Sequence, residues 1–546
     1  MQMPSTGPSG RGHSCIRGIC MYQLLIKNTT IVDGTGAPAY QADIAVKDGK
    51  ITKIAQGIEA DAECIIDGSG LVTAPGFIDI HSHSDTQFLH DNRGQSRIYQ
   101  GVTSELAGQC GSTIYPCPPE HIDRIREYAG KADAEYASAS FAEFLEKVER
   151  GGKNMGTNLI PLIGHGAIRC GVLGYENRKA TAEELRQMQE LLEADMKTGA
   201  WGLSLGLGYT PGVSSDQKEL CALGEVVAKY NGIITSHMRY QNLRTPEALE
   251  EMYEINRRTG AHVHIAHFKA SGRAAWGKAA EFAENVHQAQ KSGIHVTVDV
   301  YPYTAASSGI TNSFPKWSIQ GGTQTAVNIL KNPDKRQTLM DELEKSFGTK
   351  EDGEALYVVT TGGRCPEADG KTIWQISQEL GISMAEAAAK VCTDTNAHAT
   401  CISFAMCQED VDVMLSQNDF CIGSDGVSYS LSPEDNAGKP HPRNFGTFPR
   451  FLRLAREKKL CSLEMAVRRM TGQSAEYIGL KDRGVLKEGM IADITMFDPE
   501  TVSDTATYEN PFQKPVGIVH VFMGGEAALL NGEQTEKRLG QFILRK

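Results

Sequence analysis

Short apolar segments alternate with helical patterns through the middle of the chain. Eight segments have the length and composition of buried β-strands, at residues 76–83, 101–108, 158–165, 200–207, 232–238, 262–268, 294–301 and 420–426. Helical patterns lie between several of them, at residues 141–150, 180–199, 245–260 and 276–293. The second begins with Thr181 and Glu184 at the spacing of a capping box. Strands alternating with helices predict an α/β fold, here a (β/α)8 TIM-like barrel.

Both ends of the chain show short β-like runs separated by Gly and Asp. Residues 21–73 and 480–546 therefore predict a small β-sandwich built from both termini. The catalytic barrel would then cover residues 74–303 and 405–479. Residues 304–404 are too many for a loop, and their helical patterns predict an inserted subdomain or lid after strand seven. Residues 1–20, rich in Gly, Ser and Pro, are expected to be a disordered extension.

Composition narrows the class of protein. A chain of 546 residues is long enough for one large catalytic domain and a small companion. Its net charge of -12 argues against a nucleic-acid partner or an anionic membrane surface. No apolar run approaches the roughly 18 residues of a membrane span. The 13 cysteines form no CxxC pair, so we expect reduced thiols and a cytoplasmic location.

Two histidines stand at the end of the first predicted barrel strand, in the sequence APGFIDIHSHSD. Alternate side chains of a strand share a face, so His81 and His83 would point into one metal or substrate site. Active sites of these barrels lie where the strands end. Four more potential ligands lie at or just beyond the ends of other predicted strands: Cys110, His237, His267 and Asp425.

The donor types in this set favour zinc. Thiolate and imidazole ligands suit Zn²⁺, and a catalytic zinc keeps one position open for water. The metal activates that water and polarises a substrate carbonyl. A carboxylate beside the water can take its proton and pass it to a leaving amine. Asp425, in the sequence IGSDG, fits that role of general base and acid.

A family resemblance rests on segments found in order along the chain, from about residue 22 to the C-terminal region. They are APGFIDIHSHSD, GQCGST, GHGAIR, GAWGLSLGLGYTPG, SHMR, IAHFKASG, DVYPYT, IGSDG and HPRNFGTFPRFL. This set resembles the D-aminoacylase, or N-acyl-D-amino-acid deacylase, family of the amidohydrolase superfamily. The resemblance implies a zinc-dependent enzyme that hydrolyses N-acyl-D-amino acids to a carboxylate and a free D-amino acid.

The resemblance also assigns the metal ligands. In that family a cysteine after the second strand replaces the carboxylated lysine that many relatives carry on the fourth. Here GLSLGLGY holds no lysine, and Cys110 stands at the expected place. By resemblance Cys110, His237 and His267 would hold a tightly bound zinc. His81 and His83 would line a second, weaker metal position.

Substrate recognition requires a cation for the free carboxylate of the amino acid. Lys269 lies two residues after His267 and would share its strand face. Arg443 offers a bidentate fork for the same carboxylate. The resemblance adds three hydrogen-bonding partners: Tyr209, Tyr301 and Ser307. The two tyrosines would equally suit packing at strand ends.

Several alternatives remain open at this point. Cyclic-amide hydrolysis of the hydantoin or dihydropyrimidine type is the second candidate reaction, although its enzymes usually need the bridging lysine. A non-catalytic barrel would tend to lose ligands that this chain keeps. His262 and His264 have the opposite strand parity to His267 and are expected to be structural. A basic residue of the inserted region, such as Lys316 or Lys331, would favour an acidic D-amino acid, and an apolar lid would favour D-Met, D-Leu or D-Phe.

Overall fold

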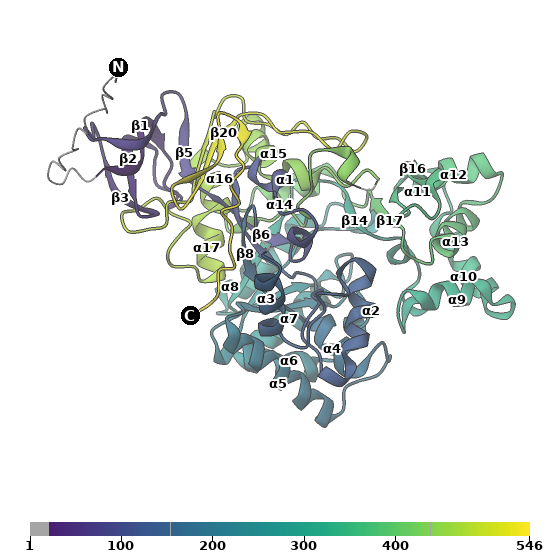
Figure 1. Ribbon diagram of the computed structural model, residues 1–546. Helices are drawn as coiled ribbons and strands as arrows, with labels where there is room; N and C mark the ends of the chain where they lie inside the picture. Colours follow the sequence, from purple (N-terminus) through teal and green to yellow (C-terminus); the bar gives the residue numbers. More distant parts are fainter. Residues whose placement is uncertain (1–20, 153, 437) are drawn as a thin grey trace, which may run out of the picture.

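The computed structural model describes residues 21–152, 154–436 and 438–546, whose arrangement Figure 1 shows. The expected extension, residues 1–20, lies outside these residues. Among them, no helix is both long and apolar enough to cross a membrane.

Parallel strands in the described part of the chain close into a ring of eight. Three pair in the order β6-β7-β8, and six in the order β18-β13-β12-β11-β10-β9. β8 and β9 are two parts of one strand interrupted at Leu162. The ring closes where the amide of Asp425 donates to the carbonyl of His81 (2.9 Å) and the amide of His83 to that of Gly426 (2.8 Å). The predicted (β/α)8 fold is confirmed. Its strands are β6 (Phe77–Ser82), β7 (Val102–Ala107), β8 (Asn158–Pro161), β9 (Ile163–Gly164), β10 (Gly202–Gly206), β11 (Ile233–His237), β12 (His262–Ile265), β13 (Val296–Val300) and β18 (Phe420–Ile422).

Apolar side chains from around the ring fill its interior. Ile80, Leu106, Ile160, Ile233 and Cys421 come from five different strands and share one core cluster. Every residue of β6 and β7 is buried, because side chains fill the ring and helices cover its outside. This double burial explains why the barrel strands appear in the sequence as continuous apolar runs.

Helices cover the outside of the ring (Figure 1). The predicted capping box at the start of α5 is present: the Thr181 side chain accepts from the amide of Glu184, whose side chain accepts from the amide of Thr181. The helices that accompany the barrel include α2 (Ile122–Asp133), α3 (Phe141–Arg150), α4 (His165–Leu173), α5 (Ala182–Thr198), α6 (Gln217–Lys229), α7 (Thr245–Thr259), α8 (Ala279–Lys291), α14 (Gln408–Leu415), α15 (Arg443–Lys458), α16 (Leu463–Met470) and α17 (Gly472–Ile478).

Segments from both ends of the chain share one sheet, which has nine strands among the described residues. Antiparallel pairing of β5 with β19 joins the two ends. Ile26 and Ile44 share a core with Met496 and Phe522 from the far side of this junction. The sheet therefore folds over on itself, as expected for the predicted β-sandwich. Its strands are β1 (Tyr22–Ile31), β2 (Tyr40–Lys47), β3 (Lys50–Ala55), β4 (Ala62–Asp67), β5 (Val72–Pro75), β19 (Ile494–Phe497), β20 (Ile518–Met523), β21 (Glu526–Leu530) and β22 (Glu533–Gln534).

A second body lies between β13 and β18 and projects to the right in Figure 1. Leu339, Val358 and Cys392 belong to a core cluster of its own. The amide of Met406 donates to the carbonyl of Thr304 (3.1 Å), which holds the two ends of the segment together. Its elements include β14 (Ala306–Gly309), η6 (Lys316–Ile319), α9 (Gln324–Lys331), α10 (Pro333–Ser346), α11 (Lys350–Glu354), β15 (Leu356–Thr360), β16 (Lys371–Thr372), α12 (Ile373–Leu380), α13 (Met384–Asp394) and β17 (Thr400–Ser403).

The last residues of the chain run along the barrel beside β8. The amide of Leu159 donates to the carbonyl of Gln541 (3.0 Å), and the amide of Ile543 donates back to the carbonyl of Leu159 (2.8 Å). On the other side, the indole of Trp201 donates to the carbonyl of Ile543 (2.6 Å). The ring of Phe542 contacts aromatic rings of the outer layer. The tail thus fills the gap between the start of β8 and the start of β10.

Gly540→Val should detach this tail. A Cβ at Gly540 would collide with the backbone carbonyls of Thr157 and Met155, which cannot move aside as a flexible side chain can. We expect the free energy of unfolding to fall by about 2–3 kcal/mol, the range for a substitution that forces backbone to shift. Denaturant unfolding measures this change. Gly348→Val, at an exposed glycine with more room around it, is the control; equal stability of the two variants would contradict the assigned role of the tail.

Candidate metal centre and active site

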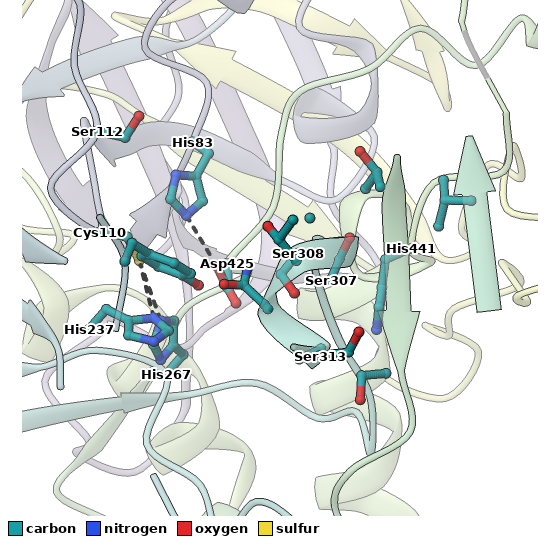
Figure 2. A pocket seen from close by; sticks show the side chains of 18 of the residues that line it. His83, Cys110, Ser112, His237, His267, Ser307, Ser308, Ser313, Asp425 and His441 are labelled. Carbon is teal, nitrogen blue, oxygen red and sulfur yellow. Dashed lines mark hydrogen bonds and ion pairs between the residues drawn. The ribbon is translucent and has the colours of Figure 1, made fainter. Parts of the chain in front are cut away.

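The side chains that carry the chemistry gather at the carboxyl end of the ring. His81 lies on β6, His83 just after it, and Cys110 shortly after β7. His237 is the last residue of β11. Figure 2 shows Cys110, His237 and His267 together, with His83 beside the carboxylate of Asp425. The structure thus brings all six predicted ligand and catalytic residues together at the carboxyl end of the barrel.

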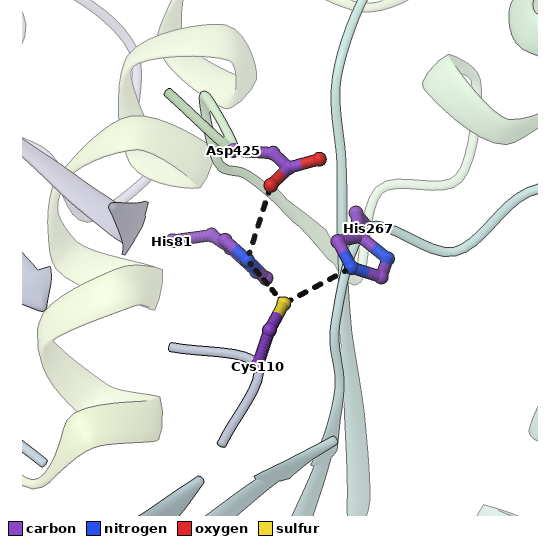
Figure 3. A group of neighbouring side chains, drawn as sticks. All are labelled: His81, Cys110, His267 and Asp425. Carbon is purple, nitrogen blue, oxygen red and sulfur yellow. Dashed lines mark hydrogen bonds and ion pairs between the residues drawn. The ribbon is translucent and has the colours of Figure 1, made fainter. Parts of the chain in front are cut away.

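Their separations suit donor atoms around a common metal ion. Sγ of Cys110 lies 3.4 Å from Nε2 of His267, 3.5 Å from Nε2 of His81 and 3.9 Å from Nδ1 of His237. The potential ligand atoms of His81, Cys110, His267 and Asp425 all lie within 4.8 Å of one another (Figure 3). Donors about 2.0–2.3 Å from a tetrahedral zinc stand roughly 3.3–3.8 Å apart. The distances from Cys110 are close to this spacing, whereas Nδ1 of His237 and Nε2 of His267 lie nearer to each other, 2.8 Å apart.

Three of these residues have a left-handed backbone. The φ angle is 55° at Cys110, 38° at His267 and 52° at Asp425. This conformation costs about 1–2 kcal/mol for a residue with a Cβ, so its surroundings must hold it. The carboxylate of Asp299 accepts from the amide of His267 (2.8 Å), and the carbonyl of His81 accepts from the amide of Asp425 (2.9 Å). The fold thus fixes the directions of these side chains.

The directions of the pKa shifts divide the predicted ligands into two groups. We call the first group, Cys110, His237 and His267, the ready set. Burial raises the pKa of the Cys110 thiol, but the imidazoles of His267 and His81 outweigh it and hold that pKa well below its usual value. Burial, helped by the Lys269 ammonium, lowers the pKa of His267 to about 4, and burial also lowers that of His237. A thiolate and two neutral imidazoles are the forms that bind zinc.

The other two histidines hold protons more firmly. Burial lowers the pKa of His83, but its hydrogen bond to Asp425 outweighs this and raises the pKa to about 9. Burial likewise disfavours the charged form of His81, yet Asp299 raises its pKa well above the usual value. Each must lose its proton before it can bind a metal. Metal binding at His81 or His83 would therefore release a proton, and their assignment to the weaker position stays a prediction.

Sequence reasoning missed Asp299, which lies on β13 and supports the site from below. Its Oδ2 is 3.2 Å from Nδ1 of His81 and 3.0 Å from Nε2 of His264, and its Oδ1 accepts from the amide of His267. His264 is thus structural, as predicted. The available signal was a carboxylate inside the predicted buried strand IHVTVDVY. Gln241 was also missed; its amide is 2.9 Å from Nδ1 of His267.

A cavity of about 730 Å³ opens onto the cluster. Four predicted substrate-binding residues line it: Lys269, Arg443, Tyr209 and Ser307. The strand-parity argument for Lys269 is wrong, however, because β12 ends at Ile265, before His267. Arg443 also has a second role, since its Nη1 donates to Asp425 (2.7 Å).

Tyr301 lies beside the two predicted carboxylate-binding cations. It is not among the residues that line this cavity. Its ring centroid lies 4.9 Å from Nζ of Lys269 and 5.4 Å from Cζ of Arg443. Its hydroxyl is buried without a hydrogen-bond partner among the described residues. Both predicted roles of Tyr301, hydrogen bonding to a substrate and packing, stay predictions.

Known proteins share the sequence and the fold of this chain. Residues 65–321 and 424–527 match the model of the amidohydrolase family. The chain belongs to the amidohydrolase family. This amidohydrolase is 31% identical to the D-aminoacylase of Alcaligenes xylosoxydans xylosoxydans, over 96% of this chain and 98% of that one. The resemblance inferred from the sequence segments is confirmed.

Solved structures of other proteins also share the fold of this chain. The N-acyl-D-glutamate deacylase of Bordetella bronchiseptica, crystallised with zinc and a phosphonate mimic of the tetrahedral intermediate, superposes on this amidohydrolase with a TM-score of 0.81. The two are 29% identical, and the match covers 96% of this chain and 100% of that one. The L-hydantoinase of Arthrobacter aurescens has a TM-score of 0.55 at 17% identity, over 96% of this chain and 100% of that one, which is a likeness of fold alone.

Replacing individual ligands should separate the tight metal position from the weak one. We expect Cys110→Ala to lose zinc, because the thiolate is the central donor of the ready set. His81→Ala should keep the tightly bound metal. Elemental analysis after dialysis measures zinc per chain, and Cys117→Ala, at a buried cysteine of a separate core cluster, is the matched control. Wild-type zinc content in Cys110→Ala, or none in His81→Ala, would refute this assignment.

Loss of the Arg443 charge should change the pH dependence. Burial raises the pKa of Asp425, but Arg443 and then His267 outweigh it and hold that pKa well below its usual value. The carboxylate must be ionised to accept a proton, so a raised pKa moves the acidic limb of the kcat/KM profile to higher pH. We expect a shift of about 1–3 units in Arg443→Met. Arg443→Lys keeps the charge and should shift less; an unmoved acidic limb in Arg443→Met would contradict the pairing.

Proposed function

We propose that this amidohydrolase hydrolyses the amide bond of N-acyl-D-amino acids, giving a carboxylate and a free D-amino acid, with Zn²⁺ as its cofactor. The observation that carries the proposal is the set of Cys110, His237 and His267 beside Asp425 at one cavity. Relatives similar to the chain over almost its whole length are named as deacylases of this class. The thiolate supplies the charge that a carboxylated lysine would otherwise bring, and β10 (GLSLG) carries no lysine.

The residues around the cavity have separate roles in the proposed reaction. When bound, Zn²⁺ polarises the amide carbonyl and makes water a stronger nucleophile. Asp425, kept ionised by Arg443, accepts a proton from the attacking water and returns it to the leaving nitrogen. Lys269 and Arg443 bind the free carboxylate of the substrate. Tyr209 and Ser307 complete the contacts by hydrogen bonding.

Hydrolysis of cyclic amides is the alternative reaction. The hydantoinase named above resembles this chain in fold only, and the bridging lysine usual in that chemistry has no counterpart on β10. The linear amide is therefore the substrate class that the site supports best.

We further infer a reducing compartment, the cytoplasm. None of the cysteines in the described ranges forms a disulfide, and most of them are buried. Cys110 acts only as a free thiolate, so oxidation would cost the site its central ligand.

Asp425→Asn should separate chemistry from metal binding. The amide has nearly the shape of the carboxylate but cannot accept the proton, so we expect kcat to fall by about 10²–10⁴-fold while zinc is retained. Amine release from N-acetyl-D-amino acids measures turnover, with the L-enantiomers as controls. Wild-type turnover in this variant rules out the mechanism, and equal rates on both enantiomers rule out the substrate class.

A further inference from the structure

One cation of the inserted segment reaches the catalytic cavity. Lys316 is the first residue of η6, and its Nζ donates to the carbonyl of Gly208 (3.0 Å) at the barrel rim. The hydroxyl of Thr210 donates to the carbonyl of Ile319 (2.9 Å), at the other end of η6. Two hydrogen bonds therefore hold this short helix against the barrel. Gly208 itself packs on His237, since a Cβ there would be 2.8 Å from Nε2 of that ring. The ammonium is thus anchored close to the metal cluster.

The charge of Lys316 is available to a ligand. The other two Lys and Arg side chains of the cavity have surroundings of their own: Arg443 pairs with Asp425, and Lys269 lies over the ring of Tyr301. No carboxylate in the described ranges lies within ion-pair distance of Lys316, although the residue borders the cavity. Burial lowers the pKa of Lys316, and no anion acts to raise it. Lys316 is an exposed residue at the cavity wall, and a cation held there without a counterion attracts an anionic ligand.

The inserted segment contributes polar side chains to the cavity wall. Those with hydroxyl or amide groups include Ser307, Ser308, Thr311, Asn312, Ser313 and Thr323. Pockets for apolar side chains are lined mainly by apolar groups. The apolar lining residues of the same segment, Ala306, Ile319, Leu356, Val359 and Ala397, are interspersed with these polar groups. A D-Met, D-Leu or D-Phe side chain would leave these polar groups without partners, whereas a carboxylate could accept hydrogen bonds from several of them.

We propose that Lys316 is a specificity residue that binds the side-chain carboxylate of an acidic substrate, an N-acyl derivative of D-glutamate or D-aspartate. This inference rests on the proposed deacylase function and names its substrate class. Sequence similarity does not decide the substrate class, because a D-aminoacylase and an N-acyl-D-glutamate deacylase are each 31% identical to the chain. In this arrangement Lys269 and Arg443 serve the carboxylate next to the scissile amide, and Lys316 serves the second one.

Steady-state kinetics of the zinc-loaded enzyme test the proposal, with N-acetyl-D-Glu, N-acetyl-D-Asp, N-acetyl-D-Met and N-acetyl-D-Leu as substrates. We expect the wild type to have a higher kcat/KM for the acidic pair. Lys316→Met should lower kcat/KM for the better acidic substrate by about 10–100-fold, the effect of losing one charged hydrogen bond, and should leave the D-Met value nearly unchanged. Lys316→Arg should restore part of the loss. Lys331→Met is the matched control, since Lys331 belongs to the same segment but lies on α9 and does not line the cavity.

The possible outcomes distinguish the proposed role of Lys316 from the proposed deacylase function. No hydrolysis of any N-acetyl-D-amino acid would refute the proposed function. Hydrolysis with a preference for D-Met or D-Leu would refute only the role of Lys316. An equal loss on acidic and apolar substrates in Lys316→Met would also overturn it, because that result indicates a structural role for η6.

Discussion

A backbone hydrogen bond joins the last strand of the barrel to the first. The amide of Asp425 donates to the carbonyl of His81, and the same contact brings Oδ1 of Asp425 to 3.6 Å from Nε2 of His81. Gly423 makes the approach possible, since a Cβ at that position would lie 2.7 Å from Cβ of His81. The backbone contact that closes the barrel thus also places Asp425 beside the metal ligands. Any change that separates β18 from β6 would move Asp425 away from the predicted metal ligands.

Buried charged and polar side chains surround the junction between β18 and β6. Asp79 accepts from the amide (2.9 Å) and the hydroxyl (2.5 Å) of Ser424, and from the amide of His81 (3.2 Å). Burial raises the pKa of Asp79 to about 6, although Arg97 opposes the shift. Arg97 also pairs with Glu105 on β7 (3.0 Å). Buried ion pairs contribute little net stability, but they strongly penalise a wrong arrangement. Here they fix how β6, β7 and β18 meet.

The sequence allowed the fold and the cluster to be predicted because both depend on local patterns. Buried parallel strands are continuous apolar runs, and in this fold family the ends of such strands carry the active site. Side-chain directions that depend on exactly where a strand ends were harder to predict. Because β12 ends at Ile265, the alternation of side chains along a strand could not place Lys269. Long-range partners were invisible as well. Nothing near Arg443 in the sequence indicates its pairing with Asp425, and nothing near Asp299 indicates that it faces His81. Lys316 and Lys331 looked equivalent, and only the docking of η6 separates them.

The position of residues 541–543 has a consequence for association between molecules. These residues pair with Leu159 and accept from Trp201, so they cover the outer edge of the barrel beside β8. The Phe542 ring packs on Phe88, Phe141 and Phe144 at the same place. Separating this segment from the barrel would expose backbone groups and aromatic rings together. An exposed strand edge is a template for pairing with another chain, so this segment protects the barrel against aggregation as well as against unfolding.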